Sequence, residues 1–207
     1  MSMAKHKVFI SYHHENDQSY KDALVKWNES VEVFIDKSVD TGDISDELTD
    51  EEIRVKIRDE YLRDSTVTIV LVGKDTAGRK HVDWEIYSSM KDGPVNKKSG
   101  IVVILLPSVT GSATHLYAAN GLAEKSLYPQ ITNWSDLSTR ENLLWGGFEK
   151  IPERIVDSLM NGAKISVTTW NEIVRDSSIL GKLIDMANEN KDTVEYDFSR
   201  PMRRHNS

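Results

Sequence analysis

The chain has 207 residues, of which 39% are hydrophobic, and its formal net charge is -7. This length and composition suit one domain with an appendage and a sizeable core, and they exclude wholesale disorder. Cysteine is absent, which excludes disulfides, thiol nucleophiles and thiolate metal sites, and the acidic balance argues against nucleic-acid binding. Since no signal peptide and no apolar run of membrane-spanning length is visible, we expect a cytoplasmic protein with no membrane partner.

The first half of the chain alternates predicted strands and helices. Strands are expected where apolar, β-branched runs end at turn residues, and helices where apolar residues recur every three or four positions. The strands are predicted over residues 7–12, 31–36, 66–72 and 99–106, and the helices over residues 17–27, 49–61 and 81–90. Asp17 is expected to cap the first helix, and Thr49 with Glu52 forms a capping box for the second. This order predicts a parallel sheet with helices on both faces.

The pattern weakens after the fourth strand. Residues 108–126 are expected to form a long loop, and residues 126–134 a short edge strand. Helices are expected after Pro152 and after a second capping box made by Thr169 and Glu172. We therefore divide the chain into an α/β domain over residues 1–135, a mainly helical extension packed on it over residues 136–190, and a disordered basic tail over residues 191–207.

The stretch from residue 64 to residue 90 is where we expect the chemistry. The third strand ends at Gly73, a polar loop follows, and the next helix carries His81, Trp84 and Glu85. In an open α/β sheet, such a loop borders the crevice in which ligands bind. An acid near the start of a helix also benefits from the positive end of the helix dipole, so Glu85 should be ionised at neutral pH. The alternative for Glu85 is an ordinary solvated residue of a first helical turn.

Several nucleotide and metal motifs are absent. The chain has no Walker loop, no dinucleotide Gly-rich fingerprint and no nucleophile elbow. Asp36, Ser38, Asp40 and Glu47 have calcium-loop spacing, but the glycine comes one place late and the segment follows a strand, so no metal site is predicted. A phosphoacceptor domain needs an aspartate at the end of the third strand, and a flavin site needs a Ser/Thr/Gly-rich loop after the first strand. The chain has neither.

Four segments resemble, in order and spacing, the signature boxes of Toll/interleukin-1 receptor (TIR) domains. They are residues 8–12, residues 33–36 with Gly42 in the next loop, residues 65–72 and residues 84–86. The chain is most similar in form to the bacterial TIR-like proteins of antiphage Thoeris systems, and the resemblance covers residues 5–107. It implies a flavodoxin-like fold. In enzymatic members it also implies cleavage of the nicotinamide-ribose bond of NAD, with an ADP-ribose or cyclic ADP-ribose-type product that activates a separate effector.

Carried over by position, the resemblance makes Glu85 the catalytic residue. The substrate-binding residues that it implies are Ser11, Tyr12, His13, His14, Asp36, Asp43, His81 and Trp84. The first four belong to the loop that lines the pocket, and the two aspartates to the loop that gates it. His81 stands where the family usually has Trp, four residues before the glutamate, and Trp84 is offered beside Glu85 instead. Trp84 could instead be a core anchor. His13, His14 and Arg79 could pair with a diphosphate, or they could be ordinary solvated loop residues.

One carboxylate is enough for the implied reaction. Ordinary glycosidases need two carboxyl groups because a poor leaving group must be protonated, whereas the nicotinamide of NAD is already a cationic pyridinium. Glu85 would offset the positive charge that grows on the ribose. We expect NAD as a substrate, no permanently bound cofactor, self-association, and an effector reached through a diffusible nucleotide product. Two alternatives stay open, a non-catalytic TIR interaction module and a nucleoside-ribosyl transferase.

Overall fold

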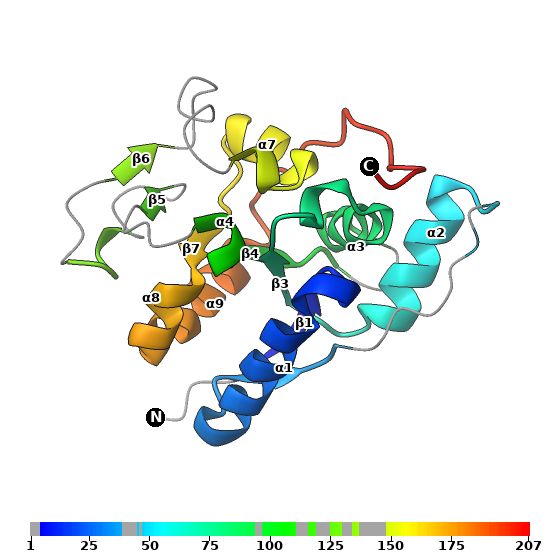
Figure 1. The fold of residues 1–207 in the computed structure, drawn as a ribbon. Helices are drawn as coiled ribbons and strands as arrows, with labels where there is room; N and C mark the ends of the chain where they lie inside the picture. Colours follow the sequence, from blue (N-terminus) through cyan, green and yellow to red (C-terminus); the bar gives the residue numbers. More distant parts are fainter. Residues whose placement is uncertain are drawn as a thin grey trace.

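A five-stranded parallel sheet lies at the centre of the molecule, in the order β2-β1-β3-β4-β7 (Figure 1). The computed structural model describes residues 5–38, 45, 47–93, 97–110, 116–118, 125–129, 134–136 and 148–207. The strands of the sheet are β1 (His6–Ser11), β2 (Phe34–Asp36), β3 (Val67–Val72), β4 (Gly100–Leu105) and β7 (Ser166–Thr169). β3 and β4 are buried along their whole length, as strands covered on both faces are. This topology confirms the predicted flavodoxin-like α/β fold.

Three helices cover the face of the sheet that is uppermost in Figure 1. They are α2 (Asp50–Lys56), which continues into a π-helical turn (Ile57–Tyr61), α3 (Lys80–Met90) and α7 (Glu153–Met160). Val82, Ile86 and Met90 of α3 pack on β3 and β4, as their spacing of four residues predicts. Thr49 and Glu52 form the predicted capping box of α2. The sequence therefore predicted both the start of α2 and the buried side of α3.

The opposite face of the sheet is covered by three other helices. They are α1 (His14–Val31), α8 (Trp170–Arg175) and α9 (Ser177–Asn190). α1 begins three residues earlier than predicted, because its N-cap is His13, whose Nδ1 accepts a hydrogen bond of 3.3 Å from the N–H of Asn16. The prediction of Asp17 as the cap is wrong. Asp17 is buried against the loop that follows β3, as described below.

The chain beyond residue 150 completes the sheet. β7 pairs in parallel with β4, and its four residues are buried. The sequence predicts helices here and no strand, because four residues are too few to give a periodic signal. Half of the predicted capping box is present, since the side chain of Thr169 accepts a hydrogen bond from the N–H of Glu172 at the start of α8, while the carboxylate of Glu172 pairs with Arg175. The fifth strand of the sheet therefore comes from the part of the chain that the sequence assigns to the extension.

Short elements connect β4 to the rest of the chain. They are α4 (Pro107–Thr110), β5 (Leu116–Ala118), β6 (Trp134–Asp136) and a 3-10 turn (Phe148–Lys150). β5 and β6 pair with each other in a separate sheet. The predicted loop over residues 108–126 thus contains most of α4 and the whole of β5. Of the predicted edge strand over residues 126–134, residues 126–129 form a turn, residues 130–133 lie outside the described residues, and Trp134 begins β6.

The C-terminal segment, residues 191–207, packs against the domain, whereas the sequence predicts a disordered tail. Val194, Tyr196 and Met202 are buried. Figure 1 shows the segment passing α7, approaching the start of α2 and ending above α3. The segment is polar and basic, and its three apolar anchors are too irregularly spaced to match a helix or a strand. Tertiary contacts therefore order a segment that composition alone indicates to be mobile.

Candidate functional site

The candidate site lies at the carboxyl ends of β1 and β3, which are neighbours in the sheet. The two strands pair up to Ser11 opposite Val70, and α3 follows β3 after a short loop. Glu85 of α3 is only 2% exposed, and its Oε2 accepts a hydrogen bond of 2.6 Å from the Oγ of Ser11, which is fully buried. The structure thus joins the predicted catalytic residue to the last residue of β1, 74 positions away in the sequence.

The alternation of side chains along β1 places Ser11 on the side of the sheet that carries Glu85. Phe9 and Ser11 have the same parity in the strand and so share one face, while Val8 points to the other. Phe9 packs with Trp84 in one core cluster. The residues next to the hydrogen-bonded pair therefore form the apolar layer beneath it, which fixes the distance between β1 and α3.

Polar contacts tie the start of α1 to the loop that follows β3. The Nδ2 of Asn16 donates to the Oδ2 of Asp75 at 2.7 Å, and a guanidinium nitrogen of Arg79 lies 3.8 Å from the Oε2 of Glu15. Arg79, one of the cations predicted to pair with a diphosphate, is thus next to a carboxylate in this structure. These contacts hold the two loops that border the carboxyl ends of β1 and β3 side by side.

Asp17 is the buried centre of this connection. Its Oδ2 accepts a hydrogen bond of 3.2 Å from the Oγ1 of Thr76, and the same Thr76 oxygen accepts from the N–H of Gly73 at 2.8 Å. A Cβ on Gly73 would lie 2.4 Å from both carboxylate oxygens of Asp17, so only glycine leaves room for this approach.

The environment of Asp17 also changes its titration. Burial raises the pKa of the Asp17 carboxyl above its ordinary value, and the hydrogen bond from Thr76 partly offsets this rise. Sequence reasoning missed this residue because an aspartate early in a helix indicates a cap. Gly73 and Thr76, which follow a buried strand, indicate a special loop in the sequence, but they do not show that Asp17 is its partner.

The other residues predicted in the loop after β1 occupy different environments. Tyr12 packs in the core on the opposite face of the sheet, where its hydroxyl donates to the Oε1 of Gln18 at 2.7 Å. His13 is buried as the N-cap of α1. His14 is exposed, and its ring stacks on that of Tyr12 with centroids 4.5 Å apart. Of these three side chains, that of His14 is the one that solvent reaches.

Trp84 and His81 lie in the first turns of α3. Trp84 is fully buried with Phe9 and Met202, and its Nε1 donates to the carbonyl oxygen of Arg203 at 2.7 Å. The ring of His81 packs edge-to-face on Trp84 with centroids 5.0 Å apart and is half-buried. Trp84 therefore occupies the core position that the sequence analysis kept as its alternative, and His81 is the more accessible of the two rings.

The loop after β2 begins against β1. The Oδ1 of Asp36 accepts a hydrogen bond of 2.8 Å from the N–H of Ser38, and the Oγ of Ser38 accepts one of 3.0 Å from the N–H of Ile10. Asp36 thus shapes the start of the predicted gating loop. Ser38 of this loop binds Ile10, the residue before Ser11. Asp43, like all of residues 39–44, lies outside the described residues.

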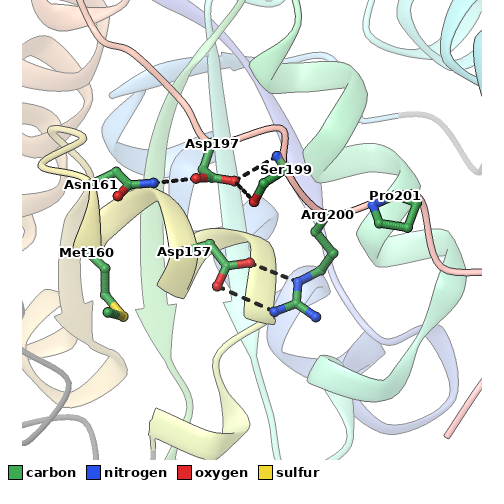
Figure 2. Close-up of a pocket in the computed structure, with 7 residues that line it drawn as sticks. All are labelled: Asp157, Met160, Asn161, Asp197, Ser199, Arg200 and Pro201. Atoms are coloured by element: carbon green, nitrogen blue, oxygen red, sulfur yellow. Dashed lines mark hydrogen bonds and ion pairs between the residues drawn. The ribbon is translucent and has the colours of Figure 1, made fainter.

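A hollow of about 410 Å³ lies between α7 and the C-terminal segment (Figure 2). It is lined by Asp157, Met160, Asn161, Asp197, Ser199, Arg200 and Pro201. Its charged groups pair within the lining, Asp157 with Arg200 and Asp197 with Asn161 and Ser199. None of the predicted site residues lines this hollow, so we do not include it in the candidate site.

The fold and the pair formed by Ser11 and Glu85 define a class, the flavodoxin-like α/β proteins with an acidic residue on the helix after the third strand. Residues 9–111 match the model of a family described as Thoeris protein ThsB, TIR-like domain. The chain belongs to this family, which confirms the resemblance seen in its sequence. No curated protein matches the chain. Within the described ranges, no helix is long and apolar enough to cross a membrane.

Proposed function

We propose that the protein is an NAD-consuming TIR enzyme of antiphage signalling, which cleaves the nicotinamide-ribose bond and releases an ADP-ribose or cyclic ADP-ribose-type product. Membership of the Thoeris TIR-like family supports this class of reaction. The observation that carries the assignment of the site is the hydrogen bond from Ser11 to Glu85 at the carboxyl ends of two neighbouring parallel strands.

The reaction needs one oriented negative charge. Nicotinamide leaves as a neutral base because its ring nitrogen is cationic in NAD, and the ribose is left with oxocarbenium character. A carboxylate of Glu85 that Ser11 holds in place offsets this charge without reorganising in the transition state. Capture of the sugar by water gives ADP-ribose, whereas capture by the adenosine end of the same molecule gives a cyclic product.

The burial of Glu85 sets a condition on this activity. A carboxylate that is 2% exposed is out of reach of a ligand as large as NAD, so the loops around the ends of β1 and β3 have to part before the substrate binds. The same observation favours a second candidate function, a non-catalytic TIR module that works by self-association.

Incubating the purified protein with NAD over a range of protein concentrations separates the two functions. We expect release of nicotinamide, an ADP-ribose species identified by its mass, and loss of both in Glu85→Gln. Glu29→Gln makes the same change at an exposed position of α1 and should keep the wild-type rate. No release at concentrations at which the protein self-associates would favour the interaction module. Release of free base from nucleosides but not from NAD would indicate a nucleoside-ribosyl transferase.

A further inference from the structure

The C-terminal segment binds the turn of α3 that carries Glu85. The N–H of Arg203 donates to the Oδ2 of Asp83 at 2.8 Å, and the carbonyl oxygen of Arg203 accepts from the Nε1 of Trp84 at 2.7 Å. Asp83 and Trp84 are the two residues immediately before Glu85. A single residue of the segment, Arg203, therefore binds both residues that precede Glu85.

A buried guanidinium anchors this contact. Arg154 of α7 is 1% exposed, and its Nε and one terminal nitrogen bind the two carboxylate oxygens of Asp83 at 3.0 and 3.1 Å. The same guanidinium donates to the carbonyl oxygens of Arg200 and Pro201 at 2.9 and 3.0 Å. Because a guanidinium is planar and its donors point in fixed directions, α7, α3 and the segment are fixed relative to one another.

Further along, the segment binds the loop that leads into α3. The N–H of Ser207 donates to the carbonyl oxygen of Gly78 at 3.0 Å, and the Oδ1 of Asn206 accepts from the N–H of Lys80 at 3.0 Å. Lys80 is the first residue of α3, so its N–H has no partner within the helix. The segment thus supplies a cap to the helix that carries Glu85.

The segment also binds the start of α2. Arg204 donates to the carbonyl oxygen of Leu48 at 2.8 Å and forms an ion pair with Asp50. Met202 is buried in the cluster that contains Phe9 and residues of α2 and α3. Phe9 is two positions from Ser11 on the same face of β1. The packing of the segment therefore reaches the layer that lies directly under the pair formed by Ser11 and Glu85.

We propose that residues 200–207 form a positioning strap, which sets Glu85 against Ser11 by fixing α3 to α2 and α7. This inference rests on the proposed function, because it assigns the strap a role in the same reaction. The strap residues act through α3 and do not meet the substrate. Loosening the strap displaces the carboxylate from Ser11 and so lowers the rate of the chemical step.

Gly78→Ala tests the strap with one methyl group. The added Cβ would lie 2.1 Å from the carbonyl oxygen of Ser207, so the end of the strap has to move away, and the backbone of Gly78 needs no positive φ. Gly181→Ala on α9 is the matched control, because within the described part of the chain its Cβ meets only a side-chain methyl of Val33, at 3.4 Å. Arg204→Gln is a second variant, which removes the ion pair to the start of α2.

Hydrogen exchange measures the strap without any reaction. In Gly78→Ala we expect faster exchange of amides in residues 73–90 and 200–207, with the amides of β3 and β4 unchanged, and the wild-type pattern in Gly181→Ala. Unchanged exchange in residues 80–90 would overturn the proposal. If the wild-type protein does not cleave NAD, the proposed function fails. Hydrogen exchange still tests whether residues 200–207 fix α3.

Kinetics measure the positioning role. We expect Gly78→Ala to lower kcat about tenfold or more with little change in KM, since a small misplacement of a catalytic group acts on the chemical step. Arg204→Gln should do the same to a smaller extent. In a Ser11→Ala background, Gly78→Ala should cost much less, because the contact that the strap maintains is already gone. If Gly78→Ala lowered kcat as much in the Ser11→Ala background as in the wild type, or if it changed KM alone, the positioning role would be overturned.

Discussion

Ser11 contacts Glu85 through a buried hydrogen bond. Its hydroxyl is fully buried, and the bond of 2.6 Å to the Oε2 of Glu85 is short, as hydrogen bonds to carboxylates are. Removing a hydrogen bond to a charged group costs about 1.5–3 kcal/mol. A serine at the end of a strand is thus expected to contribute to the rate without contacting the bond that breaks.

Ser11→Ala should therefore lower kcat for nicotinamide release by roughly tenfold to a hundredfold, the equivalent of that energy. Steady-state kinetics with NAD are the measurement. Ser30→Ala, a change of the same kind at an exposed position of α1, should leave kcat unchanged. A Ser11→Ala variant with the wild-type kcat would show that the hydroxyl does not orient the catalytic carboxylate.

Asp17 makes stability depend on pH in an unusual direction for an aspartate. Because burial raises its pKa in the folded state, folding takes up a proton, and stability falls as pH rises from the ordinary aspartate range through the folded-state pKa. Asp17→Asn removes the buried charge and keeps an oxygen that can accept from Thr76. We expect the stability of the variant relative to wild type to increase between about pH 4 and pH 7 in urea unfolding. A difference that is constant with pH would contradict the burial effect.

At the scale of elements, one buried ion pair joins α3 to α7. Arg154 and Asp83 are almost completely shielded, and Arg154 also serves two carbonyl oxygens of the C-terminal segment. Removing one partner of a buried pair leaves the other as an unpaired charge, which costs far more than the loss of a surface pair. The helix that carries Glu85 is therefore held by a polar contact as well as by its apolar side.

Arg154→Met should lower the free energy of unfolding by about 3–5 kcal/mol. Arg175→Met is the matched control, because the ion pair of Arg175 with Glu172 is half-exposed and an exposed pair contributes about 1 kcal/mol or less. Urea denaturation of both variants is the measurement. Similar losses in the two variants would show that the buried pair is not the main contact between α7 and α3.

At the scale of the whole molecule, the two halves of the chain form one sheet. The family match ends at residue 111, yet β7, α7, α8 and α9 all come from beyond it and cover both β4 and the rest of the sheet. A fragment over residues 1–135, the domain that the sequence indicates, would leave the apolar β4 as an open edge.

We therefore expect the fragment over residues 1–135 to aggregate or to unfold without cooperativity. The chain of 207 residues should unfold in a single cooperative transition. Circular dichroism during urea or heat denaturation, with size-exclusion chromatography, distinguishes the two. A soluble fragment with a sharp unfolding transition would show that the first half folds by itself.

Much of the fold could be predicted because its signals are local. β1, β3 and β4 are apolar runs bounded by turn residues, and α2 begins at a capping box, so each is specified by residues close together in the chain. Glu85 was predicted as the acid of the site through the order of the family's segments, and the chain matches that family over residues 9–111. β7 was missed because it is short, and Asp17 because its partners, Gly73 and Thr76, lie on another element.

The sequence by itself determined the parallel sheet and the family, and it pointed to Glu85 as the candidate acid, since these inferences depend on periodicity and on spacing along the chain. Only the tertiary structure decided that Ser11 donates a hydrogen bond to Glu85, that Trp84 is a core residue, and that the basic C-terminal segment binds α3. The physical reason is that hydrogen bonds and burial depend on where distant side chains meet in space. The C-terminal segment is polar and its buried apolar residues show no helical or strand period, so its contacts with α3 cannot be predicted from the sequence.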